Sequence, residues 1–273
     1  LERDLLPRFG AVPVRSIETA DLVAALQAVE SCGSLASAHR LRTLCRKIYR
    51  YAHSTGIVET DITAGLKGVL PVLGGEPRKS LNDPGEVGAL LRAIDGYQGS
   101  LVVRSALRLA PFVLVRPAEL RFAEWNEVVF YKSIWTIPAK KLRLKQPHLV
   151  PLARQAVEIL KDLQRLTGRG RYLFSSPRSA GHPLSDNALN AALRRMGYLS
   201  EEISAQGFQI IARELLPGLP TSRKDLIAHQ LGNVVRGARG KRYESIAFLP
   251  ERIRMMQQWA NYLDELKADR GHR

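Results

Sequence analysis

Two residues far apart in the chain, Arg116 and Tyr243, have the side chains that a phosphodiester-cleaving site requires. Arg116 precedes Pro117, at a predicted helix start where backbone N–H groups also favour an anion. Tyr243 follows Lys241 and Arg242, and a phenol needs such positive neighbours to act as a nucleophile at neutral pH. The pair therefore predicts a site that holds and attacks a phosphate. The structural alternatives are a surface arginine at a helix start and a tyrosine packed against the last helix.

One carboxylate belongs to the same pattern. Glu119 lies three residues after Arg116, where it could orient the cations of the site. The alternative is an exposed glutamate without that role.

The charge balance points to a polyanionic partner. The 273 residues carry a net charge of +15, and Lys and Arg gain affinity for nucleic acids by releasing counterions from phosphates. A basic protein without such a partner is the alternative. No apolar run approaches the ~18 residues of a membrane span, so we expect no membrane partner.

Cysteine and histidine usage limits the other chemistries. Cys32 and Cys45 cannot staple a domain of this size, and Cys45 falls on an apolar helical stripe. Both observations indicate a reduced, cytoplasmic protein. The 6 histidines show no metal-ligand spacing. We therefore expect no metal, no cofactor and no small-molecule substrate.

A helix predicted over residues 34–55 and closed by Gly56 carries charge of one sign. No acidic residue occurs between Glu30 and Glu59, whereas a helix kept soluble by mixed charge interleaves Glu with Lys. This suits a helix that follows a DNA backbone, and a plain solvated face is the alternative. The predicted apolar stripe is Leu41, Leu44, Cys45, Ile48 and Ala52, and the predicted DNA contacts are Arg40, Arg42, Arg46, Lys47 and Arg50.

The chain is predicted to form two domains. We assign residues 1–73 to a helical DNA-binding domain, 74–82 to a linker rich in Gly and Pro, and 83–273 to a larger domain. Because the chain begins with Leu1 rather than Met, we expect a natural N-terminus upstream.

The fold class predicted is mainly α with a small antiparallel β-sheet, an α+β arrangement. Thr19 is the expected N-cap of the first long helix, and Asp83 that of the first helix after the linker. Short strands are predicted at 128–130, 134–137 and 149–151. Further helices are predicted at about 99–113, 117–124, 153–166, 185–196, 204–216, 222–231 and 249–267.

Several ordered segments at family-like spacing resemble the tyrosine recombinase family, specifically the integrases of prophages and genomic islands. The resemblance covers essentially the whole chain and implies a helical core-binding domain followed by an integrase-like catalytic domain. Members usually carry a further N-terminal domain for arm-type sites, and nothing like it is readable here. The segments are 115–121, 137–139 leading to 147–152, 185–197, 230–231 and 249–257.

The resemblance implies a specific reaction on double-stranded DNA. A tyrosine hydroxyl attacks a phosphate, forms a 3′-phosphotyrosine and frees a 5′-hydroxyl. Two arginines hold the phosphate oxygens, a hairpin lysine protonates the leaving oxygen, and a histidine helps to move protons. Arg116 matches the first arginine and Tyr243 the nucleophile, with Lys241 and Arg242 as further DNA contacts. The family requires no metal.

Four positions depart from the family pattern. The hairpin lysine falls on Arg143, and a guanidinium is a poor acid. In the family's His-x-x-Arg motif, Gln206 replaces the histidine and Gln209 the second arginine. The later His or Trp position is Asn233. We therefore predict that DNA binding survives and that strand cleavage is impaired or absent.

Nearby residues offer partial substitutes. Lys141 or Lys145 could replace the hairpin lysine if the hairpin shifts, and both are also predicted DNA contacts. His229 is expected to be structural. The family also implies tetramers on paired DNA sites, with C-terminal segments exchanged between subunits. The last helix could serve that exchange or pack onto its own domain, through Ile253, Met256, Trp259 and Leu263.

Three functions remain in competition at this point. The first is a fully active recombinase that cuts and rejoins DNA through Tyr243, using substitute residues. The second is a degenerate integrase relative, the remnant of a mobile element or an accessory to an active relative, which clamps DNA without cutting it. The third is a basic protein that uses the fold for RNA or for assembly, although no aromatic-rich RNA platform supports it.

Overall fold

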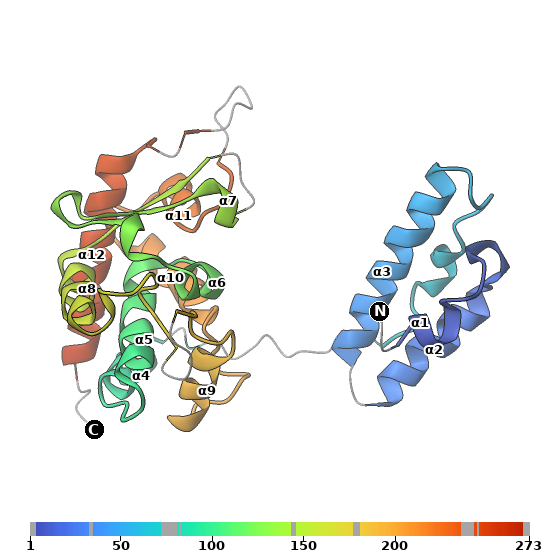
Figure 1. The fold of residues 1–273 in the computed structure, drawn as a ribbon, viewed down its shortest axis with the longest axis horizontal. Helices are drawn as coiled ribbons and strands as arrows, with labels where there is room; N and C mark the ends of the chain where they lie inside the picture. Colours follow the sequence, from blue (N-terminus) through green and yellow to red (C-terminus); the bar gives the residue numbers. More distant parts are fainter. Residues whose placement is uncertain are drawn as a thin grey trace. The chain divides into compact units, whose positions relative to one another are not determined.

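The computed structural model describes residues 4–32, 35–71, 81, 83–142, 146–176, 181–235, 243–244 and 246–269 (Figure 1). The chain divides into two compact units, 1–76 and 77–273. This division falls inside the predicted linker, of which only Leu81 is among the described residues.

The first unit is a small helical domain. Two long helices, α2 and α3, pack against each other and against the short helix η2, whose N-cap Asp61 accepts a hydrogen bond from Thr63 N at 2.9 Å. The buried residues of the unit form one hydrophobic core. Its elements are α1 (Leu6–Phe9), η1 (Val14–Ser16), α2 (Thr19–Ser31), α3 (Leu35–Ser54) and η2 (Ile62–Leu66).

Two local predictions in this unit need correction. Thr19 is the first residue of α2 rather than its cap, because the backbone N–H of Glu18 bonds to Asp21 Oδ2 at 2.9 Å and Glu18 takes the cap position. On α3, Ile48 is exposed and Tyr49 is buried in its place. Tyr49 is large enough to cross the core and donate a hydrogen bond to the Val14 carbonyl at 3.1 Å, which Ile48 could not do.

The second unit is larger and contains the sheet. Its helices are α4 (Pro84–Asp95), α5 (Leu101–Val113), α6 (Pro117–Arg121), α7 (Ala139–Leu142), α8 (Arg154–Thr167), α9 (Ala188–Arg195), α10 (Gly207–Leu215), α11 (Lys224–Gln230) and α12 (Leu249–Ala268), with the short helices η3 (Trp125–Glu127), η4 (Phe130–Lys132) and η5 (Leu216–Gly218).

The sheet has the strand order β1-β2-β3 and is antiparallel throughout, as predicted. Trp135 pairs with Val128 across one strand boundary and with Val150 across the other. The connection between β2 and β3 contains α7 and the position of Arg143. The strands are β1 (Val128–Val129), β2 (Ile134–Ile137) and β3 (His148–Pro151).

The core of the second unit surrounds α5, which contacts α4, α6, α8, α9, α10 and α12. Helix α12 runs along much of this unit beside α8 and the sheet (Figure 1). It crosses α4 so closely that a Cβ added at Gly88 would lie 2.1 Å from the Leu266 carbonyl oxygen. A glycine at this crossing lets the two backbones approach.

The last helix packs most of its apolar face onto its own unit. Met256, Trp259 and Leu263 are buried in the core of their own unit, and α12 contacts α4, α5 and α8. Only Ile253 of the four residues is exposed. In the single chain these three residues therefore show the packing onto their own domain that was one of the two roles expected for the helix.

Two further findings concern the described residues alone. None of their helices is both long enough and apolar enough to cross a membrane. Their His, Cys, Asp and Glu side chains do not gather into a group that could hold a metal ion.

Candidate active site

Arg116 lies at the junction of two helices. Helix α5 ends at Val113, Leu114 adopts a left-handed conformation with φ 56°, and Arg116 is the N-cap residue of α6. The left-handed residue ends α5, and Pro117 at the first helical position then starts α6. The Arg116 side chain is 47% exposed, so that its guanidinium remains accessible to a phosphate.

Glu119 orients Arg116, as one of its two predicted roles required. Its Oε2 accepts a hydrogen bond from Arg116 N at 2.8 Å, and its Oε1 lies 3.2 Å from Arg116 Nη1. Burial raises the pKa of Glu119, an effect opposed by these contacts with Arg116. The carboxylate thus contacts the backbone N–H and one guanidinium nitrogen of Arg116.

Gln206 and Gln209 lie at the start of α10 and form a neutral chain of hydrogen bonds. Gln206 Nε2 donates to Gln209 Oε1, and Gln209 Nε2 donates to the Leu114 carbonyl at 2.7 Å. Gln206 is exposed, whereas Gln209 is buried. The structure therefore brings Gln209 to the Arg116 turn, as its match to the second arginine predicts, but its amide is occupied by protein partners.

Tyr243 is half-buried and lies against the start of the last helix. Its backbone N–H donates to the Val235 carbonyl at 3.0 Å, and its ring meets the Phe248 ring edge-on with centroids 4.9 Å apart. The Arg223 guanidinium lies over the Phe248 ring, 5.4 Å from its centroid. Lys241 and Arg242 lie outside the described residues.

Arg223 is a residue that the motif comparison missed. Its guanidinium donates two hydrogen bonds to Asp225, which raise its pKa, and the nearby Tyr243 raises it further. The signal in the sequence is weak, because Arg223 stands beside Lys224 at an ordinary helix start. Arg223 and Tyr243 come near each other because both contact the ring of Phe248.

Helix α11 links the two predicted ends of the site. His229 Nε2 lies 3.2 Å from the carbonyl of Glu244, the residue after Tyr243. Gln230, the next residue, donates from Nε2 to the Val113 carbonyl at 3.3 Å, beside the Arg116 turn. Two consecutive residues thus hold the tyrosine segment and the arginine segment. The structural role expected for His229 stays a prediction.

Arg252, a buried cation that contacts α11, was also missed by sequence reasoning. Arg252 of α12 is 0% exposed and donates to Gln230 Oε1 from Nε at 3.2 Å and from Nη2 at 2.9 Å. It also donates to the Leu149 carbonyl. Burial lowers the pKa of Arg252 to about 10. The neighbouring His148 contacts the Gln230 carbonyl at 3.0 Å, and burial followed by the charge of Arg252 lowers its pKa to about 3.

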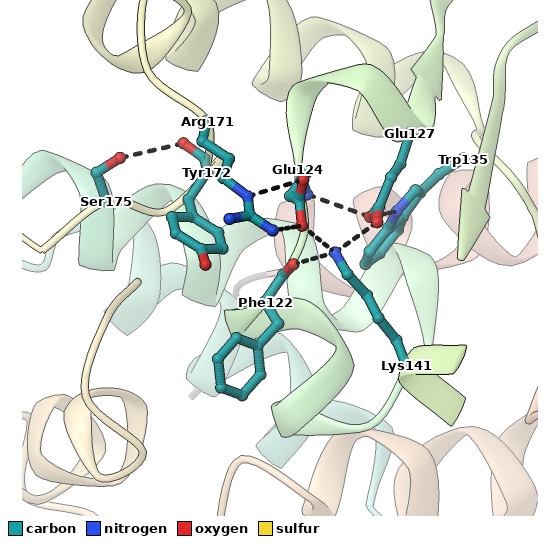
Figure 2. Close-up of polar contacts among 8 residues, drawn as sticks. All are labelled: Phe122, Glu124, Glu127, Trp135, Lys141, Arg171, Tyr172 and Ser175. Atoms are coloured by element: carbon teal, nitrogen blue, oxygen red, sulfur yellow. Dashed lines mark hydrogen bonds and ion pairs between the residues drawn. The ribbon is translucent and has the colours of Figure 1, made fainter. Parts of the chain in front are cut away.

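The hairpin between β2 and β3 is anchored by Lys141 (Figure 2). Its Nζ lies 2.8 Å from Glu124 Oε1 and 2.5 Å from Glu127 Oε1, and it donates to the Phe122 carbonyl at 2.7 Å. Arg171 binds Glu124 from the other side, and these two cations lower the pKa of Glu124 to about 2. Lys141 must leave both carboxylates before it can reach DNA. Arg143 and Lys145 lie outside the described residues.

Asn233 lies three residues after the end of α11 and is exposed. Its backbone N–H bonds to the Ala228 carbonyl at 3.0 Å, and Gly232 before it has φ 73°. The residue is therefore held by its backbone and lies at the surface.

In the first unit, the cations of α3 form a separate surface. None of the ion pairs among the described residues involves Arg40, Arg42, Arg46, Lys47 or Arg50. Arg42 and Arg46 line a hollow of about 470 Å³ together with Lys67, which the sequence analysis had not singled out. Asp61 lines the same hollow, so one carboxylate stands among these cations.

Comparisons with known proteins agree with this architecture. The profile described as the phage integrase central domain matches residues 1–69, and that described as the phage integrase family matches residues 83–209. The chain is 32% identical to putative protein IntB of Escherichia coli (strain K12), over 97% of this chain and 70% of that protein. It is 32% identical to the integrase of Enterobacteria phage P4, over 97% of this chain and 63% of that protein. The chain thus spans about two thirds of these relatives.

Solved structures share the fold at lower identity. A lambda integrase dimer bound to a COC′ core site superposes with a TM-score of 0.60 at 17% identity, covering 96% of this chain and 83% of that one. The Tn1549 transposon integrase in complex with circular intermediate DNA has a TM-score of 0.62 at 13% identity, covering 83% and 80%. Since the family profiles match both units and IntB is related over nearly the whole chain, this protein belongs to the phage integrase family of tyrosine recombinases.

Proposed function

We propose that this integrase binds double-stranded DNA in site-specific recombination, with Arg116 on a backbone phosphate, and that its strand cleavage is strongly impaired. One observation carries the proposal. Arg116 presents an exposed guanidinium that pairs with Glu119. At the second arginine position, the amide of Gln209 is instead hydrogen-bonded to Leu114 and Gln206. The phosphate would therefore meet one charged group at this turn where the family has two.

The chemical step places different demands on the site from those of binding. The Tyr243 oxygen would attack phosphorus, the bond to the 5′ oxygen would break, and that oxygen would take a proton to leave as a hydroxyl. Loss of one preorganised charge donor lowers such a rate by ~10²–10³, and loss of a general acid by ~10²–10⁴. The losses are not additive, but several altered positions together would suppress cleavage strongly.

A fully active enzyme is the second candidate, and one observation favours it. Arg223 brings a guanidinium to the aromatic pair of Tyr243 and Phe248. This cation could support the phenolate where the family uses other groups. The hairpin lysines would then have to supply the proton, which for Lys141 requires release from Glu124 and Glu127.

A covalent-trapping experiment separates the two candidates. The protein is incubated with a pool of nicked duplexes with a randomised core, denatured, and examined for a protein–DNA adduct. We expect no adduct above the level of Tyr243→Phe. The quadruple variant Arg143→Lys, Gln206→His, Gln209→Arg and Asn233→His should restore an adduct that Tyr243→Phe again abolishes. A strong adduct from the unaltered protein would establish the active alternative.

Assembly on DNA is a separate part of the proposal. The lambda integrase structures include a dimer on a core site and a tetramer on a Holliday junction. We propose that this chain also forms a homo-oligomer on DNA in the cytoplasm. Because α12 buries most of its apolar face, its part in the contacts would be confined to its exposed side, which includes Ile253.

A further inference from the structure

The C-terminal end of α5 is capped by side chains from later parts of the chain. A helix leaves its last carbonyls without helical partners, and buried carbonyls need hydrogen bonds from elsewhere. Trp259 Nε1 donates to the Pro111 carbonyl at 2.8 Å. Gln230 serves the Val113 carbonyl and Gln209 the Leu114 carbonyl. Helices α12, α11 and α10 each supply one donor to the turn that precedes Arg116.

This turn needs such support because of its backbone conformation. Leu114 has φ 56°, a left-handed value that residues with a Cβ rarely adopt. Such conformations persist where the surrounding structure over-determines them. Leu114 is fully buried, and the Gln209 amide binds the carbonyl of this same residue. A side chain from outside the turn therefore fixes the backbone at Leu114, and with it the position of the following residues up to Arg116.

The chemistry of the partners fixes how both amides point. Arg252 has only donors, so the oxygen of Gln230 faces Arg252 and its NH₂ group faces the Val113 carbonyl. The Leu114 carbonyl only accepts, so Gln209 turns its NH₂ group to Leu114 and its oxygen to Gln206. An amide can do both at once, whereas a carboxylate could not donate and a methionine could do neither.

We propose that Gln209 and Gln230 are positioning residues for Arg116: they hold the Leu114 turn and so keep the guanidinium in place for a DNA phosphate. Gln209 thereby keeps a role at the position where the family has a phosphate-binding arginine. The inference rests on the proposed function, since it assumes that Arg116 contacts DNA. Neither glutamine touches the phosphate itself.

A double-mutant cycle tests the role of Gln209. Affinity for a duplex of about 30 base pairs is measured for the wild type, Gln209→Met, Arg116→Ala and the double variant, at several salt concentrations. Methionine keeps the size of the side chain and removes its donor. We expect Gln209→Met alone to weaken binding about 3- to 10-fold, and to change it less than about 2-fold once Arg116 is alanine. The log–log salt slope should fall toward that of Arg116→Ala.

Controls keep the outcomes distinct. Gln155→Met removes another buried glutamine amide, which donates to Asp264 at 2.8 Å, and should leave affinity unchanged. If Gln209→Met does not fold by circular dichroism, Gln206→Leu tests the same chain from its exposed end and should weaken binding in the same Arg116-dependent way. An equal loss in both Arg116 backgrounds, or no loss, would overturn the positioning role. Unchanged affinity of Arg116→Ala would instead overturn the proposed function.

Discussion

His229 and Gln230 are consecutive residues at the end of α11, and they bind the two segments of the candidate site separately. His229 contacts the carbonyl after Tyr243, and Gln230 contacts the carbonyl three residues before Arg116. A shift of this short helix would therefore move both segments together. Helix α11 therefore connects the segment of the candidate nucleophile Tyr243 with the turn before the candidate phosphate ligand Arg116.

The cations of α3 should dominate the salt dependence of DNA binding. Each phosphate contact contributes about 0.9 to the log–log slope of affinity against salt. Charge reversal at Arg42, Arg46 and Arg50 should weaken affinity and flatten this slope in a fluorescence-anisotropy titration. Arg165→Glu, on an exposed position of α8 that pairs with Asp162, is the matched control. An unchanged slope for the triple variant would remove α3 from the interface.

Glu124→Gln should destabilise the second unit at neutral pH by about 1–3 kcal/mol, because Lys141 and Arg171 lose a buried partner. The folded pKa of Glu124, about 2, lies below its unfolded value near 4.5. Its stabilising effect is therefore full above about 4.5 and disappears as the pH falls toward 2. Urea unfolding of wild type and variant between pH 7 and 3 should show the difference narrowing below pH 4.5.

The exposed residue Glu158 provides the comparison for that series. Glu158→Gln should change the unfolding free energy little at any pH in this range. A difference between wild type and Glu124→Gln that stays constant down to pH 3 would contradict the ion-pair origin of the shift.

His148 should make the protein less stable as the solution becomes mildly acidic. Its folded pKa is about 3, whereas an unfolded histidine titrates near 6.5, so only the unfolded state gains a proton in between. The stability that neutral, buried His148 contributes is full above about pH 6.5 and is lost progressively as the pH falls to 3. Between pH 7 and 5 this single group should remove about 2 kcal/mol of unfolding free energy.

The measurement compares unfolding free energies of wild type and His148→Gln at pH 7, 6 and 5. Between pH 7 and 5 the unfolding free energy of the variant should fall by about 2 kcal/mol less than that of the wild type, even if the variant is less stable at pH 7. His182→Gln, on an exposed residue, should keep the wild-type slope. Equal slopes for wild type and His148→Gln would show that His148 titrates normally in the folded protein.

Gly88→Ala tests the close crossing of α4 and α12. The new Cβ would meet the Leu266 carbonyl oxygen, a backbone atom that cannot move without shifting α12. We expect a loss of about 1–3 kcal/mol in unfolding free energy, seen as a lower Tm. Gly218→Ala introduces the same methyl where no atom lies within 4 Å and should be close to neutral. A Gly88→Ala protein as stable as wild type would show that the helices separate easily.

Local signals in the sequence located most elements correctly. Asp83, Pro84 and Glu86 predict the start of α4, and Glu86 N indeed donates to Asp83 Oδ1 at 3.1 Å. Gly56, with φ 71°, follows the end of α3 as expected. The helix predicted to reach residue 124 ends at Arg121, because the backbone of Glu124 pairs with Tyr172 in an isolated bridge. That partner lies too far along the chain to be read from a local pattern.

The amino-acid sequence by itself determined the family and most of the order of the elements, since these depend on motifs or on contacts within a few residues. Tertiary structure alone decided that Gln209 and Gln230 cap the end of α5, that Lys141 is held by two carboxylates and that α12 buries its apolar face. The physical reason is that a side-chain amide or ammonium binds whichever group packing brings near it. That group can lie a hundred residues away, where no spacing rule reaches it.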